Sequence, residues 1–466
     1  MTIRTTITAL IIWLSGIGLA YGQSTLSIPE SNIINRSEYR QTYLAGSYFS
    51  LLGVAPGIRV RANTANFENQ SGGSQHLPLS STYLRLAQVG GVVLLGSGPE
   101  VMLSQTYQAI YTALLELLGN GDVLIQARFP IAGTTWTAGE YQAPIQLDVT
   151  GVTLGGITPS THNLTLSVPA FLRATGGAPA ATLHVDDLSL FRSGAALSST
   201  TPIQLSSSLP YIPSIRAESA NFNFSSQAAY NQLPVVPVSE LQLQLISPVT
   251  SPSISLSTNR QDLIGNTGLP VPVENNESLT YNYNLPATSL QQYFTQAGNY
   301  STSITYGWRK TQAAYPPGEL QSESNALLHI VVDDLSEIIA NQVNIDLVYG
   351  SASDYQQGVY TDLPGHIRLS KTTPYNLYVR AESNAFQSGT DQIPLQVLQI
   401  GPSPGQADLQ TVTLSTSNQL LLESSSPVID RLLDVRYTIP ASASPQLLEK
   451  PAAVYSADII FSLVAP

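Results

Sequence analysis

The stretch Asn344-Ile345-Asp346-Leu347-Val348-Tyr349 places Ile, Leu and Tyr at every second position. Successive side chains of a β-strand point to opposite faces, so this period buries one face in a core and leaves the other in water. Ser253-Ile254-Ser255-Leu256-Ser257 has the same alternation, and most of the chain follows it in runs of about four to eight residues bounded by Gly, Pro, Asn and Ser. The sequence therefore predicts an all-β protein made of antiparallel sandwiches.

One segment departs from this period. Between residues 104 and 118, apolar residues recur at helical spacing ahead of Gly119-Asn120-Gly121. These residues are Ile110, Leu114, Leu115 and Leu118. We expect one short helix there.

An internal repeat gives a stronger indication of the architecture, because a repeated motif implies a repeated structural unit. Three segments share a hydrophobic residue, then Arg-Ala, then four residues and Phe, and each precedes a proline with apolar neighbours (Pro78, Pro234 and Pro394). The segments are Val60-Arg61-Ala62 to Phe67, Ile215-Arg216-Ala217 to Phe222, and Val379-Arg380-Ala381 to Phe386.

A second block recurs further along each copy, after the prolines Pro130, Pro286 and Pro440. It reads Ala138-Gly139-Glu140-Tyr141, Ala297-Gly298-Asn299-Tyr300 and Ala452-Ala453-Val454-Tyr455. We expect a turn followed by a closing strand whose tyrosine packs in the core. The predicted anchors of the repeat are Phe67, Phe222, Phe386, Tyr141, Tyr300 and Tyr455.

The repeat divides the chain into three tandem sandwich domains. We expect a signal peptide at 1–22, units at 23–155, 156–312 and 325–466, and a linker at 313–324 that contains Pro316-Pro317-Gly318. Val185-Asp186-Asp187-Leu188-Ser189 and Val332-Asp333-Asp334-Leu335-Ser336 mark the starts of the second and third copies.

The first residues predict export. Arg4 precedes the apolar run Ala9-Leu10-Ile11-Ile12-Trp13-Leu14, and Ala20-Tyr21-Gly22 places small side chains where signal peptidase cuts, so the mature chain should begin at Gln23. We expect a location in the periplasm, on the cell surface or outside the cell. No stretch is apolar for long enough to predict a transmembrane segment.

Composition narrows the partners. The chain has no cysteine, so each domain depends on its own buried core, and only 11% of its residues are charged. The formal net charge is -12, which repels nucleic acid and anionic lipid. Neutral glycans or other proteins are the expected partners, and no cofactor is indicated.

Each unit closes on a short Ala-rich motif and an alternating strand, as in Ala297-Gly298-Asn299-Tyr300-Ser301-Thr302-Ser303-Ile304 and Lys450 to Ile459. With the upstream Ile393-Pro394-Leu395, this resembles the spore coat protein U-like domain and the related chaperone-usher pilin subunits. The resemblance implies immunoglobulin-like sandwiches, and pilin subunits are completed by a strand from a neighbour. The chain departs from that family in lacking its common cysteines and in having three units. The segment from Ser24 to Pro29 is a candidate donor strand.

The sequence indicates no catalytic or metal site. Its five histidines form no metal-binding or catalytic pattern, and they are His76, His162, His184, His329 and His366. The paired acids Asp186-Asp187 and Asp333-Asp334 are more typical of capping than of calcium binding. Arg61, Arg216 and Arg380 are expected to face solvent or to form structural pairs.

Trp136 and Trp308 are the candidate ligand residues, because sugar-binding sandwiches expose aromatic platforms, although packing in the core is the default for both. Three functions remain after this survey. The first is an exported structural or adhesive surface protein, such as a pilus-like subunit that contacts other subunits through strand edges. The second is an envelope protein that binds carbohydrate, and the third, an enzyme on a sandwich scaffold, has the least support.

Overall fold

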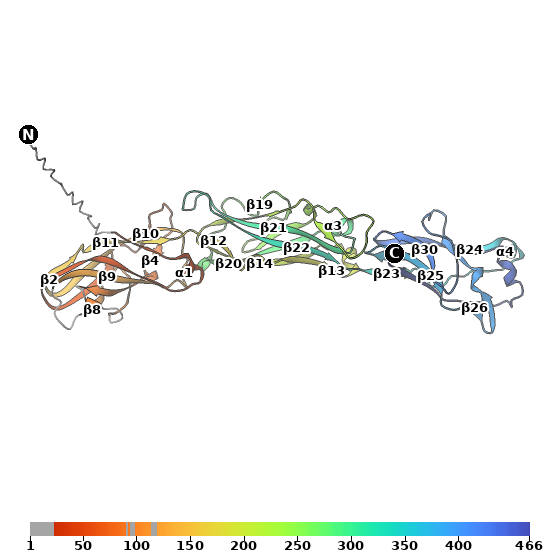
Figure 1. The fold of residues 1–466 in the computed structure, drawn as a ribbon, viewed down its shortest axis with the longest axis horizontal. Helices are drawn as coiled ribbons and strands as arrows, with labels where there is room; N and C mark the ends of the chain where they lie inside the picture. Colours follow the sequence, from red (N-terminus) through yellow and green to blue (C-terminus); the bar gives the residue numbers. More distant parts are fainter. Residues whose placement is uncertain (1–22, 90–91, 94–97, 113–118) are drawn as a thin grey trace, which may run out of the picture.

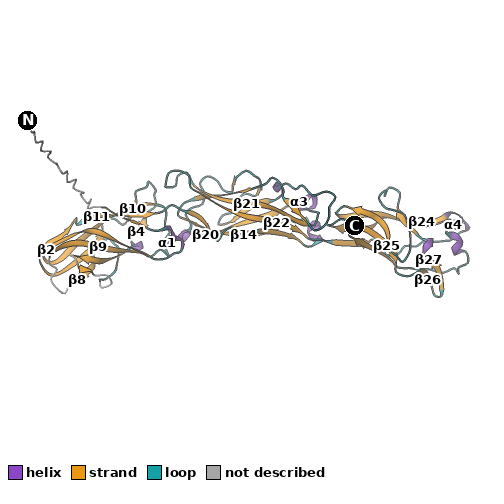
Figure 2. Ribbon diagram, in the orientation of Figure 1, coloured by secondary structure: helices purple, strands orange, loops and turns teal. Residues whose placement is uncertain are grey.

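The protein is elongated, and its β-sheets follow one another along the long axis in the order of the sequence (Figure 1). The structure is a computed structural model that describes residues 23–89, 92–93, 98–112 and 119–466, so the expected signal peptide lies outside the described residues. Almost all of the regular structure is strand, with a few short helices (Figure 2). The prediction of an all-β fold of antiparallel sandwiches is confirmed. Among the described residues, no helix is long and apolar enough to cross a membrane.

The buried apolar side chains fall into groups that follow the sequence. One group runs from Leu26 to Phe171, a second from Leu172 to Val332, and two adjoining groups lie between Leu363 and Leu447. We name the corresponding segments unit 1 (23–171), unit 2 (172–332) and unit 3 (333–466). That each unit folds independently remains a prediction.

Unit 1 is built on two long strands, β2 and β10, that run through the whole body and pair along most of their length. The strand order is β1-β11-β10-β2-β9-β5-β6. Its elements are β1 (Gln23–Ser27), α1 (Glu30–Ile34), β2 (Tyr39–Ala62), β3 (Asn66–Asn69), β4 (Leu77–Pro78), η1 (Leu79–Ser81), β5 (Tyr83–Val89), β6 (Val92–Val93), β7 (Val101–Met102), β8 (Gln108–Thr112), β9 (Gly119–Phe129), β10 (Gly139–Thr158) and β11 (Thr161–Val168).

Unit 2 consists of two sheets, with the orders β12-β14-β20-β17-β18 and β13-β22-β21-β15-β19. Its elements are β12 (Leu172–Thr175), β13 (Ala181–Val185), α2 (Leu188–Arg192), β14 (Leu197–Ser207), β15 (Tyr211–Ala217), β16 (Asn223–Ser225), η2 (Val238–Glu240), β17 (Gln242–Ser247), β18 (Ile254–Ser255), β19 (Gln261–Asp262), η3 (Val273–Asn275), β20 (Asn276–Leu285), α3 (Ala287–Tyr293), β21 (Gly298–Lys310) and β22 (Gln321–Val332).

Unit 3 repeats the first of these sheets as β23-β24-β31-β28-β29 but has only β30-β25-β32 in place of the second. Its elements are β23 (Ser336–Ala340), α4 (Ala352–Gln357), β24 (Gly358–Lys371), β25 (Tyr375–Ala381), β26 (Ala385–Ser388), β27 (Asp391–Pro394), η4 (Leu395–Val397), β28 (Gln399–Pro402), β29 (Val412–Thr413), β30 (Gln419–Ser425), β31 (Val428–Pro440), η5 (Ser444–Leu447) and β32 (Ile459–Val464).

The repeat of the sequence corresponds to a repeat of the structure. The alanine of each Arg-Ala pair faces an isoleucine of the closing strand: Ala62 faces Ile145, Ala217 faces Ile304, and Ala381 faces Ile459. The hydroxyl of the shared tyrosine donates a hydrogen bond to the carbonyl four residues upstream in every copy. These bonds are Tyr141 to Thr137 (2.9 Å), Tyr300 to Gln296 (3.0 Å) and Tyr455 to Pro451 (3.1 Å).

The unit boundaries differ from those expected at 155 and 312. Residues 155 and 156 lie inside β10, which continues to Thr158 and pairs with β2. The expected linker, 313–324, runs into β22, which pairs with β21 and contributes Leu328 and Ile330 to the core of unit 2. Both units extend further because each adds one more strand after the strand that begins at the repeated motif.

Three local predictions are wrong. Gln108–Thr112, in the segment expected to be helical, is strand β8, because pairing with β2 and the burial of Ile110 override the helical spacing; residues 113–118 of that segment lie outside the described residues. Pro78 and Pro394 directly precede the 3-10 helices η1 and η4. In unit 2 the proline at the equivalent place, before η2, is Pro237 and not Pro234. Its neighbours Val236 and Val238 are buried, whereas Leu233 and Val235 are exposed.

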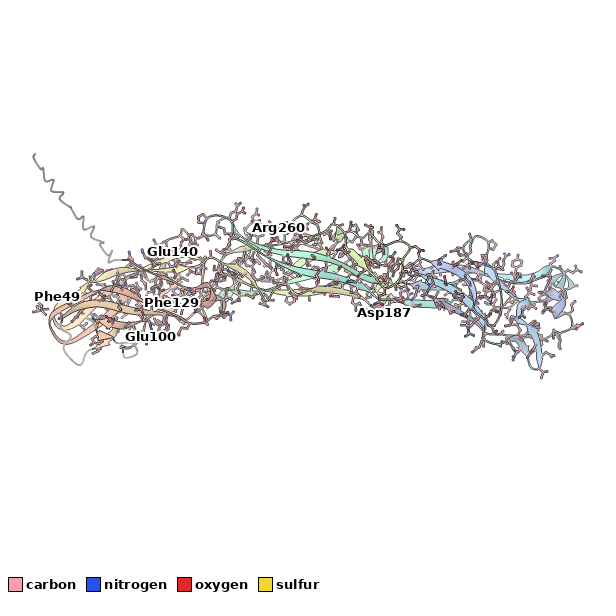
Figure 3. The ribbon with its side chains drawn as sticks, viewed as in Figure 1. Phe49, Glu100, Phe129, Glu140, Asp187 and Arg260 are labelled. Atoms are coloured by element: carbon pink, nitrogen blue, oxygen red, sulfur yellow. The ribbon has the colours of Figure 1, made fainter. Side chains whose placement is uncertain are left out.

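The third correction concerns the two Val-Asp-Asp-Leu-Ser motifs. They do not begin equivalent copies, because Val185 ends β13 and Val332 ends the adjacent parallel strand β22. The two motifs therefore lie side by side at the end of unit 2 that faces unit 3, where Figure 3 labels Asp187.

The junctions between the units use a repeated contact. The N–H of Ala138 donates to the Ser208 carbonyl of unit 2 (2.9 Å), and the N–H of Ala297 donates to the Thr372 carbonyl near the start of unit 3 (2.7 Å). Both donors are the first residue of the repeated Ala-rich motif, so one sequence feature both begins the closing strand and contacts the next unit.

Asn275 strengthens the first junction. Its side chain is fully buried and accepts a hydrogen bond from the Trp136 N–H (2.8 Å) while donating to the carbonyls of Trp136 (2.6 Å) and Ser207 (2.8 Å). Its φ of 64° is in the left-handed region, which asparagine tolerates better than most residues. Asn275 thus connects a loop of unit 1 to a strand end of unit 2.

Replacing Asn275 by Ala should destabilise the junction by about 2 to 4 kcal/mol, because three buried backbone groups lose their partner and Ala tolerates the positive φ poorly. Scanning calorimetry would measure this as a lower midpoint for units 1 and 2. Asn266→Ala, in an exposed loop, is the matched control. Equal unfolding midpoints for both variants would contradict the role of Asn275 in stabilising the junction.

Candidate functional site

In units 1 and 2, one strand lies between the closing strand that begins at the repeated motif and an early strand of the unit, β1 or β13, which we call its first strand. In unit 1, β11 pairs in parallel with β1 and antiparallel with β10. In unit 2, β22 pairs in parallel with β13 and antiparallel with β21. The inserted strand therefore satisfies the backbone groups of strands on both of its sides.

Unit 3 has the two flanking segments but no inserted strand among the described residues. Its closing strand β32 pairs with β25, and the opposite edge of β32 has no neighbour in the sheet. The C-terminus, which follows β32, lies near β23 and β30, where unit 3 meets unit 2 (Figure 1). The open edge thus runs along the body of unit 3.

The counterpart of β1 and β13 in unit 3 is the stretch 343–349, the segment whose alternation predicted a strand, and its Tyr349 packs in the same apolar group as Tyr455. This segment forms no strand, and none of its backbone groups forms a backbone–backbone hydrogen bond within the described part of the chain. Ile345, Leu347 and Tyr349 are nevertheless half-buried against the core, and the residues between them are exposed. The alternation is correct, but the hydrogen-bonding partner that makes such a segment a strand is missing.

The side chains of the closing strand are also less buried in unit 3 than in unit 1. In unit 1, Tyr141, Ala143 and Ile145 are fully buried, with exposed fractions of 0%. Their counterparts in unit 3 are only half-buried, and so are Phe461 and Leu463 further along β32. These counterparts are Tyr455, Ala457 and Ile459. By comparison with units 1 and 2, the missing strand would lie between 343–349 and residues 453–464, and we call this position the acceptor groove.

The acceptor groove combines two features that favour binding of an extended peptide. An unpaired strand edge offers backbone donors and acceptors, and the half-buried apolar side chains beside it lose water when they are covered. Its chemistry is thus that of strand addition.

The two candidate ligand residues do not lie at a surface. Trp136 and Trp308 are both fully buried, and the indole N–H of Trp136 donates to the carbonyl of Ile131 (3.1 Å). Neither ring can serve as an exposed platform for a sugar, so the expectation of a ligand role for them is corrected to one of core packing.

The repeat anchors lie in the cores to different extents. Tyr141, Tyr300 and Phe67 are fully buried, and Phe222 is 5% exposed. Phe386 and Tyr455 are half-buried, and both belong to the unit that lacks the inserted strand.

The candidate donor strand at Ser24 to Pro29 is already in use. Residues Gln23–Ser27 form β1, which pairs with β11, and both Leu26 and Ile28 are buried in unit 1. In this structure the segment completes its own unit and does not extend toward another chain.

Several of the charged residues considered as candidates have structural partners. Arg61 donates to Gln146 (2.7 Å), and Arg216 pairs with Glu218 (3.2 Å). Asp187 caps α2 by accepting from the Ser189 N–H (2.6 Å), which lowers its pKa. Among the described residues, no group of three or more metal-binding side chains could hold an ion.

Each histidine has a structural partner as well. The buried rings of His162 and His366 contact the hydroxyls of Tyr43 (3.4 Å) and Tyr437 (2.9 Å). The other pairs, nearer the surface, are His76 with Glu68, His184 with Asp333 and His329 with Asn299.

Burial of His162 predicts a pH dependence for unit 1. Burial lowers the pKa of its imidazole to about 4, so the folded state holds it neutral while the unfolded chain protonates near pH 6.5. The unfolded state then binds more protons between pH 6.5 and 4, and stability should fall by roughly 2 to 3 kcal/mol across that window as the pH is lowered. Denaturant unfolding at several pH values should show a flatter profile for His162→Gln. Parallel plots of unfolding free energy against pH for the two proteins would contradict a role of His162 in this pH dependence.

The open edge predicts a difference in hydrogen exchange. Amides of residues 304–309 lie between β15 and β22, whereas amides of residues 459–464 have β25 on one side alone. About half of the amides in 459–464 should therefore exchange at least about tenfold faster than those in 304–309. Mass spectrometry of peptic fragments measures both segments in one sample. Equal protection would mean that a partner strand covers β32.

Comparison with known proteins gives only distant likenesses. No family model matches the sequence, and no curated protein matches it. Among solved structures, the chain is similar to CfaE, the adhesive subunit of the CFA/I fimbria of enterotoxigenic Escherichia coli. The identity is 10% and the TM-score 0.29, over 67% of this chain and 98% of that one.

Two further solved structures show the same level of likeness. One is a chain of the CsuC–CsuE chaperone–tip adhesin complex from the archaic chaperone-usher Csu pili of Acinetobacter baumannii, with 13% identity and a TM-score of 0.31 over 63% of this chain and 99% of that one. The other is the CupB6 tip adhesin of Pseudomonas aeruginosa, with 8% identity and a TM-score of 0.25 over 64% and 89%. With TM-scores below 0.5, these likenesses do not by themselves assign a function.

Proposed function

We propose that the chain is an exported subunit of a pilus-like or adhesive surface assembly, and that unit 3 binds a β-strand of another polypeptide. The single observation that carries this proposal is the acceptor groove. Units 1 and 2 each contain the strand that this groove lacks, so the same chain provides two examples of the completed state.

Strand addition at this site satisfies two requirements at once. The incoming backbone pairs with the free edge of β32 and with 343–349, and its apolar side chains cover residues that are now half-buried. Covering several large apolar side chains stabilises the complex by roughly 0.8 kcal/mol for each buried methylene group. Such a contact is strong enough to link subunits without any covalent bond.

The opposite end of the molecule supports an adhesive role. Phe49 and Leu51 of β2 and Leu154 of β10 are exposed by 49%, 70% and 62%. Figure 3 shows Phe49 at the free end of unit 1, the end farthest from unit 3. Exposed apolar groups gathered at one end are typical of a contact surface. We assign the adhesive contact to this end and the subunit contact to unit 3.

We also propose that the protein is not an enzyme. The histidines that could act as acids or bases have structural partners, and the arginines and aspartates for which contacts are described form pairs or caps. The groove offers apolar side chains and peptide groups, which suit the recognition of a strand and not the transfer of a chemical group.

A strand supplied in cis tests the acceptor role. Appending an Asn-Gly turn and a copy of residues 321–332 after Pro466 should complete unit 3, because this copy can fold back along β32 as β22 does along β21. Tethering raises the effective concentration into the millimolar range, so an imperfect fit still binds. We expect a higher melting temperature for unit 3 and protection of the amides of residues 459–464.

Assembly is the second readout of the same variant. On an unheated detergent gel, native protein released from cells should run as a high-mass ladder that collapses on boiling, whereas the appended variant should run as a monomer in both lanes. The control appends the same strand with Ile330→Asp, which should restore the ladder. A native monomer in both lanes, together with protected β32 amides, would overturn the proposal.

A further inference from the structure

The two completed units show which side chains the acceptor groove admits. In each unit the inserted strand packs between the closing strand and the first strand, so an inward residue where both pairings overlap lies between one neighbour on each side. Interiors are close-packed, and the summed size of such a triplet should therefore be similar in all three units. This inference rests on the proposed acceptor role and adds the composition of the incoming strand.

The middle position is the same in all three units. In unit 1, Leu166 lies between Tyr141 and Leu26. In unit 2, Ile330 lies between Tyr300 and Leu183. In unit 3 the repeated tyrosine is Tyr455. On the other side of the groove we place Leu347, which lies five residues before α4, as Leu183 lies five residues before α2. The position that faces Tyr455 therefore accepts a large aliphatic residue.

The next inward position toward the N-terminus of the incoming strand differs in size. Its occupants in units 1 and 2 are Leu164, between Ala143 and Ser24, and Leu328, between Thr302 and Ala181. The first-strand neighbour is thus small in both. In unit 3 the flanks are Ala457 and Ile345, and the larger isoleucine leaves less room for the incoming side chain.

At the inward position toward the C-terminus of the incoming strand, the flanking residues are also larger in unit 3. In unit 2, Val332 lies between Gly298 and Val185. In unit 3 the flanks become Ala453 and Tyr349. The tyrosine is fixed in place by Tyr355, at 4.7 Å between ring centroids, and by a 3.2 Å hydrogen bond to Ser444. Both flanks are larger than in unit 2.

We infer that the partner strand has one large aliphatic residue facing Tyr455 and smaller residues than Leu and Val at the inward positions on either side of it. The groove then discriminates against strands of the β11 and β22 type, which the chain itself contains. Ile345 and Tyr349 are the residues that set this specificity, since overpacking a well-filled core is unfavourable.

Labelled synthetic peptides test the inference on the full mature chain. The first peptide copies residues 321–332, and the second is the same sequence with Leu328→Val and Val332→Ala. A third peptide has Ile330→Asp and should not bind. Fluorescence anisotropy should give a dissociation constant at least about tenfold lower for the second peptide than for the first. Hydrogen exchange at residues 459–464 locates the bound peptide.

Variants of the groove provide the reciprocal test. Enlarging the groove with Ile345→Ala and Tyr349→Val should reverse the order, so that the first peptide binds more tightly. The control, Val343→Ala with Val348→Ala, changes two exposed positions of the same segment and should leave the order unchanged. Circular dichroism confirms that each variant remains folded.

The outcomes separate the two claims. If no peptide binds and the β32 amides stay unchanged, the acceptor role itself fails. If peptides protect β32 but the copy of 321–332 binds as tightly as the smaller peptide, or the groove variants do not reverse the order, the acceptor role stands and the inference about size is overturned.

Discussion

The structure depends on one constraint, which is that a strand buried between two others must pair on both edges. In unit 1, β11 meets this need for β1 and β10, and in unit 2, β22 meets it for β13 and β21. Where the inserted strand is present, the tyrosine and isoleucine of the closing strand are fully buried. Where the inserted strand is missing, their counterparts stay half-buried. The burial of the inward side chains of the closing strand therefore depends on its pairing with the inserted strand.

The same repeated motif determines both how a unit closes and how it contacts the next. Ala138 and Ala297 each begin a closing strand and each donate a hydrogen bond to the following unit. In unit 3 the counterpart, Ala452, is exposed. The open ladder and the exposed junction residue therefore belong to the same unit, and a neighbouring subunit that supplied a strand would also lie near this alanine. Linkage between subunits can thus use the geometry that already links the units within the chain.

Sequence patterns predicted much of the fold but not the feature that matters most. Alternation identified the strands, and the spacing of Phe67, Tyr141 and their repeats identified equivalent positions. The sequence pattern did not show which strands pair with each other, because a segment such as 344–349 alternates in the same way whether or not a neighbouring strand forms hydrogen bonds with it. The boundaries shifted for the same reason, since β22 looked like the start of unit 3 until its register with β21 placed it in unit 2. Trp136 and Trp308 show the converse limit, because composition alone does not distinguish an exposed ring from a buried one.

An open groove must also avoid binding copies of the same chain at random. Edge strands are protected in many proteins by charged residues, and here Asp346 and Asp458 are exposed within and beside the two segments that border the groove. The net charge of -12 adds a repulsion between copies that acts within about a Debye length, roughly 8 Å at physiological ionic strength. A partner strand with a neutral or basic outward face would not experience this repulsion. Charge therefore selects the partner on the outward face of the incoming strand, while the sizes of Ile345 and Tyr349 select it on the inward face.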